Sequence, residues 1–199
     1  MAGLRSPEEI LTNELKEIYS AERQLTRTLP RLAKKATSER LREMLDHRRE
    51  QGTTLMEQLD EVFEEMQVSK GRAKNPAAEG LLEDTSQHLE LVEDQRLVDP
   101  VLLADTQKIE HYCIASWGTA RSLGRLLEET KVVETMDQVL DEGKRFDEEL
   151  TKLAEEEINP RMLEEHQGGE DGEEERQSGN GGGRSRSRRA QGREGGRSR

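Results

Sequence analysis

Apolar residues recur along the chain at intervals of three, four and seven positions, which is the spacing of one face of an α-helix. The first of these stripes consists of Leu11, Leu15, Ile18, Leu25, Leu29 and Leu32. A second stripe lies between Leu41 and Met66, a third follows Asp99-Pro100, and a fourth runs from about Val132 to Glu157. The pattern therefore predicts long amphipathic helices, the last of which we expect to end at Asn159-Pro160.

The lengths of the connections predict how these helices pair. Short links join the first helix to the second and the third to the fourth, so each pair should form an antiparallel hairpin. The link between the second and third helices covers about 30 residues, which is long enough to run back along a bundle. It holds a polar loop over 67–76 and a short predicted helix over 77–92. The predicted fold is all-α, a ferritin-like four-helix bundle with one long crossover between helices 2 and 3.

Polar residues interrupt the apolar stripes at mid-length in each long helix. Their spacing from neighbouring apolar positions points them toward the bundle interior, and they are Glu22, Arg48, Glu110 and Asp147. An unpaired charge in a core carries a penalty of several kcal/mol or shifts its pKa until it is neutral. These carboxylates therefore need compensation, either from metal ions or from Arg48.

Composition narrows the class of protein. Among 199 residues, 37% are charged and 31% are hydrophobic, and no stretch approaches the roughly 20 apolar residues that span a bilayer. We therefore expect no membrane association. A single cysteine excludes an intramolecular disulfide framework and fits a reducing compartment, so a cytoplasmic location is expected.

The C-terminal part of the chain differs from the rest in composition. We divide the chain into a bundle over 1–160 and a tail over 161–199, which is acidic at first and then rich in Arg, Gly and Ser. Residues 167–199 contain no Leu, Ile, Val, Phe, Tyr or Trp, so this segment is predicted to be disordered.

Residues 178–199 hold seven arginines and one glutamate, a net charge of +6 within a chain of −12. Weak, salt-sensitive contact with nucleic acid is one interpretation, through Arg184, Arg186, Arg188 and Arg189. A merely solubilising tail is the other.

Two stretches carry a family resemblance. They are Tyr19-Ser-Ala-Glu22-Arg-Gln-Leu25 in the first helix and Gln107-Lys-Ile-Glu110-His-Tyr-Cys-Ile-Ala-Ser-Trp-Gly118-Thr119 in the third. Through them the chain resembles, over about residues 7–155, the ferritin-like family that contains the YciE and YciF stress-associated proteins. The resemblance implies a helical bundle, commonly a homodimer, with a carboxylate/histidine di-metal centre.

The resemblance also implies where metal ligands would lie. The matching acidic positions are Glu22, Glu110 and Asp147. Arg48 stands where the family has a histidine in the second helix. The remaining ligand positions of a gapless alignment hold Gln51, Cys113 and Gly143.

Arg48 changes the chemistry expected of this centre, because a guanidinium cannot ligate a metal and repels a nearby divalent ion. We therefore hypothesise that Arg48 forms a buried ion-pair cluster with Glu22, Glu110 and Asp147, and that no cofactor is bound. The alternative is a shifted second helix in which His47 and Glu50 join those carboxylates and bind iron or manganese.

Three functions follow from these alternatives. The leading expectation is a non-enzymatic, stress-associated protein with a degenerate di-metal site. A di-iron or di-manganese carboxylate protein that handles metal or peroxide is the second, and an interaction module with a nucleic-acid-binding tail is the third. Cys113 is expected to be a small core residue, and the remaining histidines, His88, His111 and His166, are expected at the surface.

Overall fold

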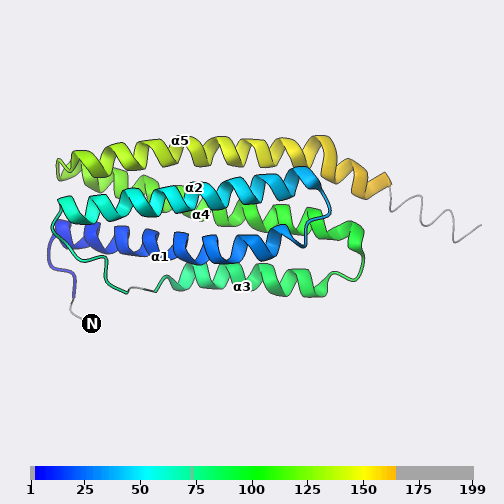
Figure 1. The fold of residues 1–199 in the computed structure, drawn as a ribbon, viewed down its shortest axis with the longest axis horizontal. Helices are drawn as coiled ribbons and strands as arrows, with labels where there is room; N and C mark the ends of the chain where they lie inside the picture. Colours follow the sequence, from blue (N-terminus) through cyan, green and yellow to red (C-terminus); the bar gives the residue numbers. More distant parts are fainter. Residues whose placement is uncertain (1–2, 73, 165–199) are drawn as a thin grey trace, which may run out of the picture. The chain divides into compact units, whose positions relative to one another are not determined.

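A computed structural model of the protein describes residues 3–72 and 74–164, and its elements within these ranges are helical (Figure 1). The α-helices are α1 (Pro7–Ala33), α2 (Glu39–Glu65), α3 (Pro76–Leu91), α4 (Val98–Leu126) and α5 (Thr130–Leu153). A short 3₁₀ turn, η1 (Gln95–Leu97), precedes α4, and a π-helical turn, η2 (Ala154–Ile158), follows α5. The tail arginines that are candidates for nucleic-acid contact, Arg184, Arg186, Arg188 and Arg189, lie outside the described residues.

The long helices form two hairpins, α1 with α2 and α4 with α5 (Figure 1). Helix α1 also packs against α4, and α2 against α5, so that these helices enclose one core. The crossover that contains α3 returns the chain to the end where α2 begins, which makes α2 and α4 parallel (Figure 1). The predicted all-α bundle with a long crossover is confirmed.

Helix α3 lies outside the bundle and packs against α1 and α4 (Figure 1). Its buried positions are Ala78, Leu82, Thr85 and Leu89, which follow one helical face. Asn75 caps its first turn by accepting a hydrogen bond from the Ala78 amide, and Pro76 occupies the first helical position. The same Asn75 side chain donates to the Tyr112 hydroxyl on α4 at 2.6 Å, which anchors the crossover to the bundle.

Buried Asp99 joins the beginnings of α2 and α4. It is 1% exposed and accepts hydrogen bonds from the Thr37 amide at 2.7 Å and the Ser38 amide at 2.8 Å, and also from the Thr37 hydroxyl. Arg161 donates to the same carboxylate at 2.9 Å. Ser38 in turn caps α2 by accepting from the Leu41 amide. Asp99 thus satisfies amides at the N-terminal end of a neighbouring helix rather than those of its own.

The last helix continues past the predicted end. We expected Asn159-Pro160 to end it, but residues 159–164 are helical. The turn before Pro160 is π-helical, and the Asn159 amide bonds to the Ala154 carbonyl five residues back. This wider turn accommodates a proline, which has no amide hydrogen and crowds the preceding turn of an ordinary α-helix. Ile158 remains buried as a result.

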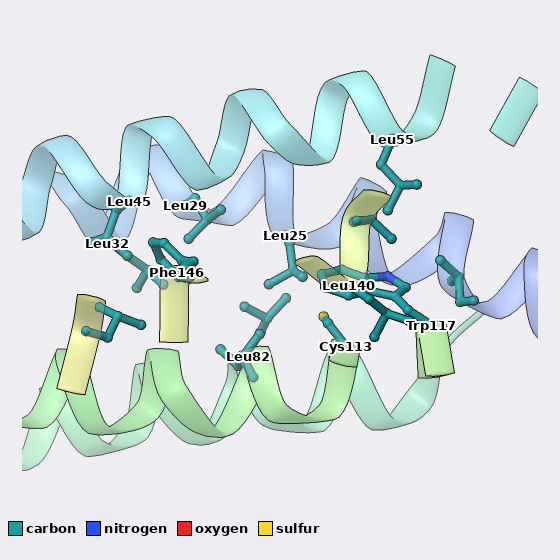
Figure 2. Packing of buried hydrophobic residues seen from close by; sticks show 14 of the residues in the cluster. Leu25, Leu29, Leu32, Leu45, Leu55, Leu82, Cys113, Trp117, Leu140 and Phe146 are labelled. Carbon is teal, nitrogen blue, oxygen red and sulfur yellow. The ribbon is translucent and has the colours of Figure 1, made fainter. Parts of the chain in front are cut away.

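Leucine side chains fill most of the core, together with Trp117 and Phe146 (Figure 2). Trp117 of α4 is 1% exposed, and Phe146 of α5 is 3% exposed. Removing a leucine side chain from such a core typically lowers the free energy of unfolding by about 2–5 kcal/mol. None of the helices within the two described ranges is long and apolar enough to cross a membrane.

Candidate functional site

The centre of the bundle holds three charged residues from three helices. They are Glu22 of α1, Arg48 of α2 and Glu110 of α4, which are 0%, 3% and 1% exposed. Each follows the apolar stripe of its helix, which is why helical periodicity alone points all three inward.

Arg48 contacts both glutamates through hydrogen bonds. Its Nη1 and Nη2 donate to Oε2 and Oε1 of Glu22, each at 3.0 Å, and its Nε donates to Oε2 of Glu110 at 2.7 Å. The guanidinium carbon also lies 5.4 Å from the centre of the Trp117 ring. This is a fork-to-fork arginine–carboxylate pair with a second carboxylate on Nε and an aromatic ring beside it.

Two glycines provide the space that these side chains occupy. A Cβ on Gly52 of α2 would lie 2.7 Å from Oε2 of Glu22, and one on Gly143 of α5 would lie 2.4 Å from Cζ3 of Trp117. Glycine within a helix lowers stability by about 1 kcal/mol relative to alanine, so both positions have a packing reason. At Gly143, the indole ring fills the position where the family resemblance implied a ligand.

One negative charge of the cluster is uncompensated, because two carboxylates face one guanidinium. Oε1 of Glu110 is buried and has no hydrogen-bond partner within the described part of the chain. Burial raises the pKa of Glu110, and the charge of Arg48 only partly opposes this. Burial also disfavours the charge of Arg48, but Glu110 and Glu22 outweigh it and raise the pKa of this guanidinium. Arg48 is therefore a permanent cation, and Glu110 binds a proton more readily than an exposed glutamate does.

Cys113 follows Glu110 by three residues, about one turn of α4, and is buried in the hydrophobic core near Trp117 (Figure 2). Burial raises the pKa of its thiol well above the usual value, and the neighbouring Glu22 carboxylate adds to this effect. The thiolate is the nucleophile and metal ligand, so this cysteine is a poor candidate for either role.

The expectation that Asp147 belongs to this cluster is wrong. Its side chain is 21% exposed, and its carboxylate contacts Nε2 of His111 at 3.0 Å rather than Arg48. Asp147 follows Phe146 by one residue, a rotation of about 100° around the axis of α5, and this places it at the edge of the buried stripe. It reaches the surface side of the α4–α5 hairpin, where His111 is exposed.

The alternative ligands His47 and Glu50 are also away from the centre. Both are exposed, and they line a surface groove of about 510 Å³ between α2 and α5, together with Gln51. The structure therefore does not bring the shifted set of His47 and Glu50 together with Glu22 and Glu110. Helix α2 is regular over Glu39–Glu65, without the bulge that such a shift needs.

A second polar cluster, which the sequence did not predict, joins α3 to α4. His88 of α3 contacts Oδ2 of Asp105 on α4 through Nδ1 at 2.8 Å and Oδ1 of Asp84 through Nε2 at 3.4 Å. Lys108 binds the other oxygen of Asp105 at 2.8 Å. His88 is thus half-buried between two aspartates rather than a plain surface residue. The spacing of Asp84 and His88 by four residues was a visible signal, but Asp105 comes from another helix.

The central residues do not fit a di-metal centre. Such a centre in a helical bundle needs about six ligands, with carboxylates that bridge the ions and histidines that complete them. Here the guanidinium of Arg48 lies between the two glutamates, Asp147 is turned away, and Cys113 and Gly143 supply no carboxylate. The arrangement holds helices together by charge-assisted hydrogen bonds, and it contains no paired nucleophile and base.

Comparisons with known proteins agree with this architecture. The sequence profile of a family described as a domain of unknown function, DUF892, matches residues 6–163. The protein YciF of Escherichia coli (strain K12) is 35% identical over 158 residues, which cover 79% of this chain and 95% of YciF.

Solved structures give the same relationship. The crystal structure of the E. coli stress protein YciF matches with a TM-score of 0.75 over 78% of this chain and 99% of that one. YcfI from Rhodopseudomonas palustris matches with a TM-score of 0.72 and 28% identity, over 74% of this chain and 94% of that one. On the strength of the profile match and the similarity to YciF, the chain belongs to the DUF892 family.

Proposed function

We propose that this protein is a non-enzymatic, YciF-type stress-associated protein in which Arg48 takes the place of a di-metal centre. The observation that carries the proposal is the three-bond contact of buried Arg48 with Glu22 and Glu110. A fixed cation already pairs with both carboxylates that would otherwise bind metal, so the centre of the bundle supports structure instead of chemistry.

The descriptions of two relatives support a stress-associated, structural role. YciF is described as a stress protein, and the description of YcfI proposes it as a structural protein. Both resemble this chain over most of its described length. We carry these descriptions over as a class of role, without a specific stress or partner.

Replacing a di-metal centre by a buried arginine has a consequence for the register of the helices. A buried ion pair seldom adds more stability than a well-packed apolar group of equal size, but it penalises arrangements that leave a charge unpaired. The Arg48 cluster ties α1, α2 and α4 at one level of the bundle. A shift of any of these helices by one turn would leave at least one of the buried charges without its partner.

The decisive experiment is metal loading of the purified full chain. After anaerobic incubation with Fe(II), and separately with Mn(II), the protein is desalted and its metal content is measured by elemental analysis. We expect near-zero retention of either metal by the wild-type protein. Retention of about two ions per chain, as in a di-metal carboxylate protein, would overturn the proposal and favour the metal- or peroxide-handling alternative.

Two variants make the result specific. Arg48→His removes the permanent cation and supplies the residue type that the family resemblance implies at this position, so we expect it to retain more iron than wild type. Arg49→His, which changes the neighbouring half-buried arginine, is the matched control and should leave metal content unchanged.

We also propose a cytoplasmic location and a homodimeric state. The single cysteine of the sequence supports the first, since it leaves no pair for an intramolecular disulfide. The family resemblance supports the second. Size-exclusion chromatography with light scattering tests the dimer, and a monomeric mass at micromolar concentration would contradict it.

A further inference from the structure

The cluster between α3 and α4 combines the side chains of a metal site. Asp84 and His88 are four residues apart on α3, so they occupy the same helical face, and Asp105 approaches them from α4. One ligand atom from each of these three residues lies within 4.8 Å of the others. Among the described residues, this is the group of carboxylates and histidine whose ligand atoms converge in this way.

Burial gives the three ligands different roles. The Asp105 side chain is 4% exposed, whereas those of His88 and Asp84 are 36% and 52% exposed. Asp105 is held in place by Lys108, which binds Oδ1 and leaves Oδ2 directed at His88. The cluster therefore has one fixed carboxylate on its inner side and two adjustable ligands on its solvent side, where an ion can enter.

The space beside the cluster allows water to complete a coordination sphere. A groove of about 530 Å³ runs along the corner formed by α3, η1 and α4, and His88, Asp105 and Lys108 are among the residues that line it. Its remaining wall is largely apolar and includes Leu91, Val92, Leu97 and Val101. Three protein ligands with an open position toward such a groove are the usual arrangement of a tetrahedral zinc site that keeps one water.

The donor types select the ion. One imidazole and two carboxylates suit Zn²⁺, whereas Ca²⁺ requires six to eight oxygen ligands and Mg²⁺ an octahedral oxygen shell. Zinc–ligand bonds of about 2.1 Å place neighbouring ligand atoms roughly 3.4 Å apart. In the structure His88 uses a different ring nitrogen for each aspartate, Nε2 toward Asp84 at 3.4 Å and Nδ1 toward Asp105 at 2.8 Å. Zinc binding therefore requires the half-exposed imidazole to turn, so that one of its nitrogens faces the ion together with both carboxylates.

We propose that Asp84, His88 and Asp105 form a binding site for one Zn²⁺ ion, which would staple the crossover helix α3 to α4. The site shares no residue with the Arg48 cluster and does not depend on the function proposed above. Lys108 opposes binding, because its ammonium competes for Asp105 and repels a cation nearby.

The test is titration of the chelator-treated full chain with ZnCl₂ by isothermal calorimetry at neutral pH. We expect one ion per chain in the wild-type protein and a loss of affinity of about tenfold or more in His88→Ala, because one of three ligands is removed. Lys108→Met should bind more tightly, by roughly tenfold, since the competing cation is gone. A merely structural His88–Asp105 contact would not produce this gain.

Controls separate this site from the others. His47→Ala and His111→Ala change exposed histidines elsewhere and should leave the affinity within about twofold of wild type, well inside the tenfold effect of losing a ligand. Circular dichroism of each variant checks that it is folded, and Co²⁺ absorption in the visible range reports coordination independently of heat.

The outcomes of the two metal experiments are distinguishable. Absence of zinc binding in the wild type, or an unchanged affinity in His88→Ala, would overturn this inference and leave the Arg48 proposal intact. Iron that is retained equally by wild type and His88→Ala would overturn the Arg48 proposal instead.

Discussion

Arg48 and Glu22 face each other across the α1–α2 interface through two parallel hydrogen bonds of 3.0 Å each. The guanidinium is planar, so this fork fixes the rotation of both side chains at once. Its remaining contact, from Nε to Glu110 at 2.7 Å, brings in α4. A single side chain thus links three of the helices that enclose the core. Its removal should therefore weaken the packing of all three.

Replacing Arg48 by methionine should lower the free energy of unfolding by about 3–5 kcal/mol, which is typical when one partner of a buried ion pair is removed. Methionine fills a similar volume, so the loss reports the two glutamates that stay buried without a cation. Urea denaturation followed by circular dichroism measures the change.

Arg49→Met serves as the control for this prediction. The Arg49 side chain is 39% exposed and lies 3.8 Å from Glu50, so its removal should alter stability by no more than about 0.5 kcal/mol. Equal stability of Arg48→Met and the wild-type protein would show that Arg48 does not compensate the buried glutamates.

Gly52→Ala should destabilise the protein by about 1–3 kcal/mol, although alanine is the better helix former. The new Cβ would lie 2.7 Å from Oε2 of Glu22 and 3.2 Å from Nη1 of Arg48, so the fork must be displaced. Gly80→Ala on α3 is the matched control, because a Cβ there meets nothing within 4 Å. It should stabilise by about 0.5–1 kcal/mol through helix propensity alone.

Thermal unfolding tests both glycine variants together, since their melting temperatures should move in opposite directions. A stabilised Gly52→Ala protein would mean that the Arg48 and Glu22 side chains can move away from the new Cβ without lowering stability. The tight packing inferred for this level of the bundle would then be wrong.

The sequence predicted the bundle because helical periodicity is a local property of the chain. Ser6 and Ser38 begin α1 and α2 as N-caps, and the apolar stripes appear in the structure as buried faces. Burial of Glu22, Arg48 and Glu110 followed from the same periodicity. Their charges also made pairing the natural outcome, because unpaired ions are rarely retained in a core.

The partners of individual side chains were harder to predict. They depend on how the edges of the apolar faces of two neighbouring helices come together. Asp147 lies at the edge of its stripe, and one residue of helical rotation decides between Arg48 and His111. The role of Gly143 depends on the Trp117 ring from another helix. Similarly, Asp84 and His88 share a visible helical spacing, but only tertiary structure brings Asp105 to them.

Removal of residues 178–199 should reduce binding to nucleic acid if the tail is the binding element. This segment carries a net charge of +6 and no aromatic residue, so the expected contact is to phosphates and weakens with salt. Fluorescence anisotropy with a duplex oligonucleotide, titrated at low and physiological salt, measures it. A full-length variant with serine at Arg184, Arg186, Arg188 and Arg189 is the control for length. An affinity that is unchanged by truncation would exclude the tail as the contact.

Glu110→Gln should change how stability depends on pH. Burial raises the pKa of Glu110 in the folded protein, so the folded state binds more protons than the unfolded state above the ordinary glutamate pKa of about 4.3. This glutamate therefore makes stability fall as pH rises from that value toward its raised pKa. Glutamine cannot ionise, yet its amide oxygen can still accept the Arg48 Nε bond. We expect the stability of the variant, relative to wild type, to increase as the pH rises above the ordinary glutamate pKa of about 4.3.

The comparison uses the slope of unfolding free energy against pH, which is independent of any constant difference between the proteins. Urea denaturation at a series of pH values supplies it, and Glu50→Gln, at an exposed position on α2, is the control for an ordinary surface carboxylate. Parallel profiles for Glu110→Gln and wild type would mean that Glu110 has the same proton affinity in both states. The uncompensated charge would then have to be balanced by a donor to Oε1, such as a buried water.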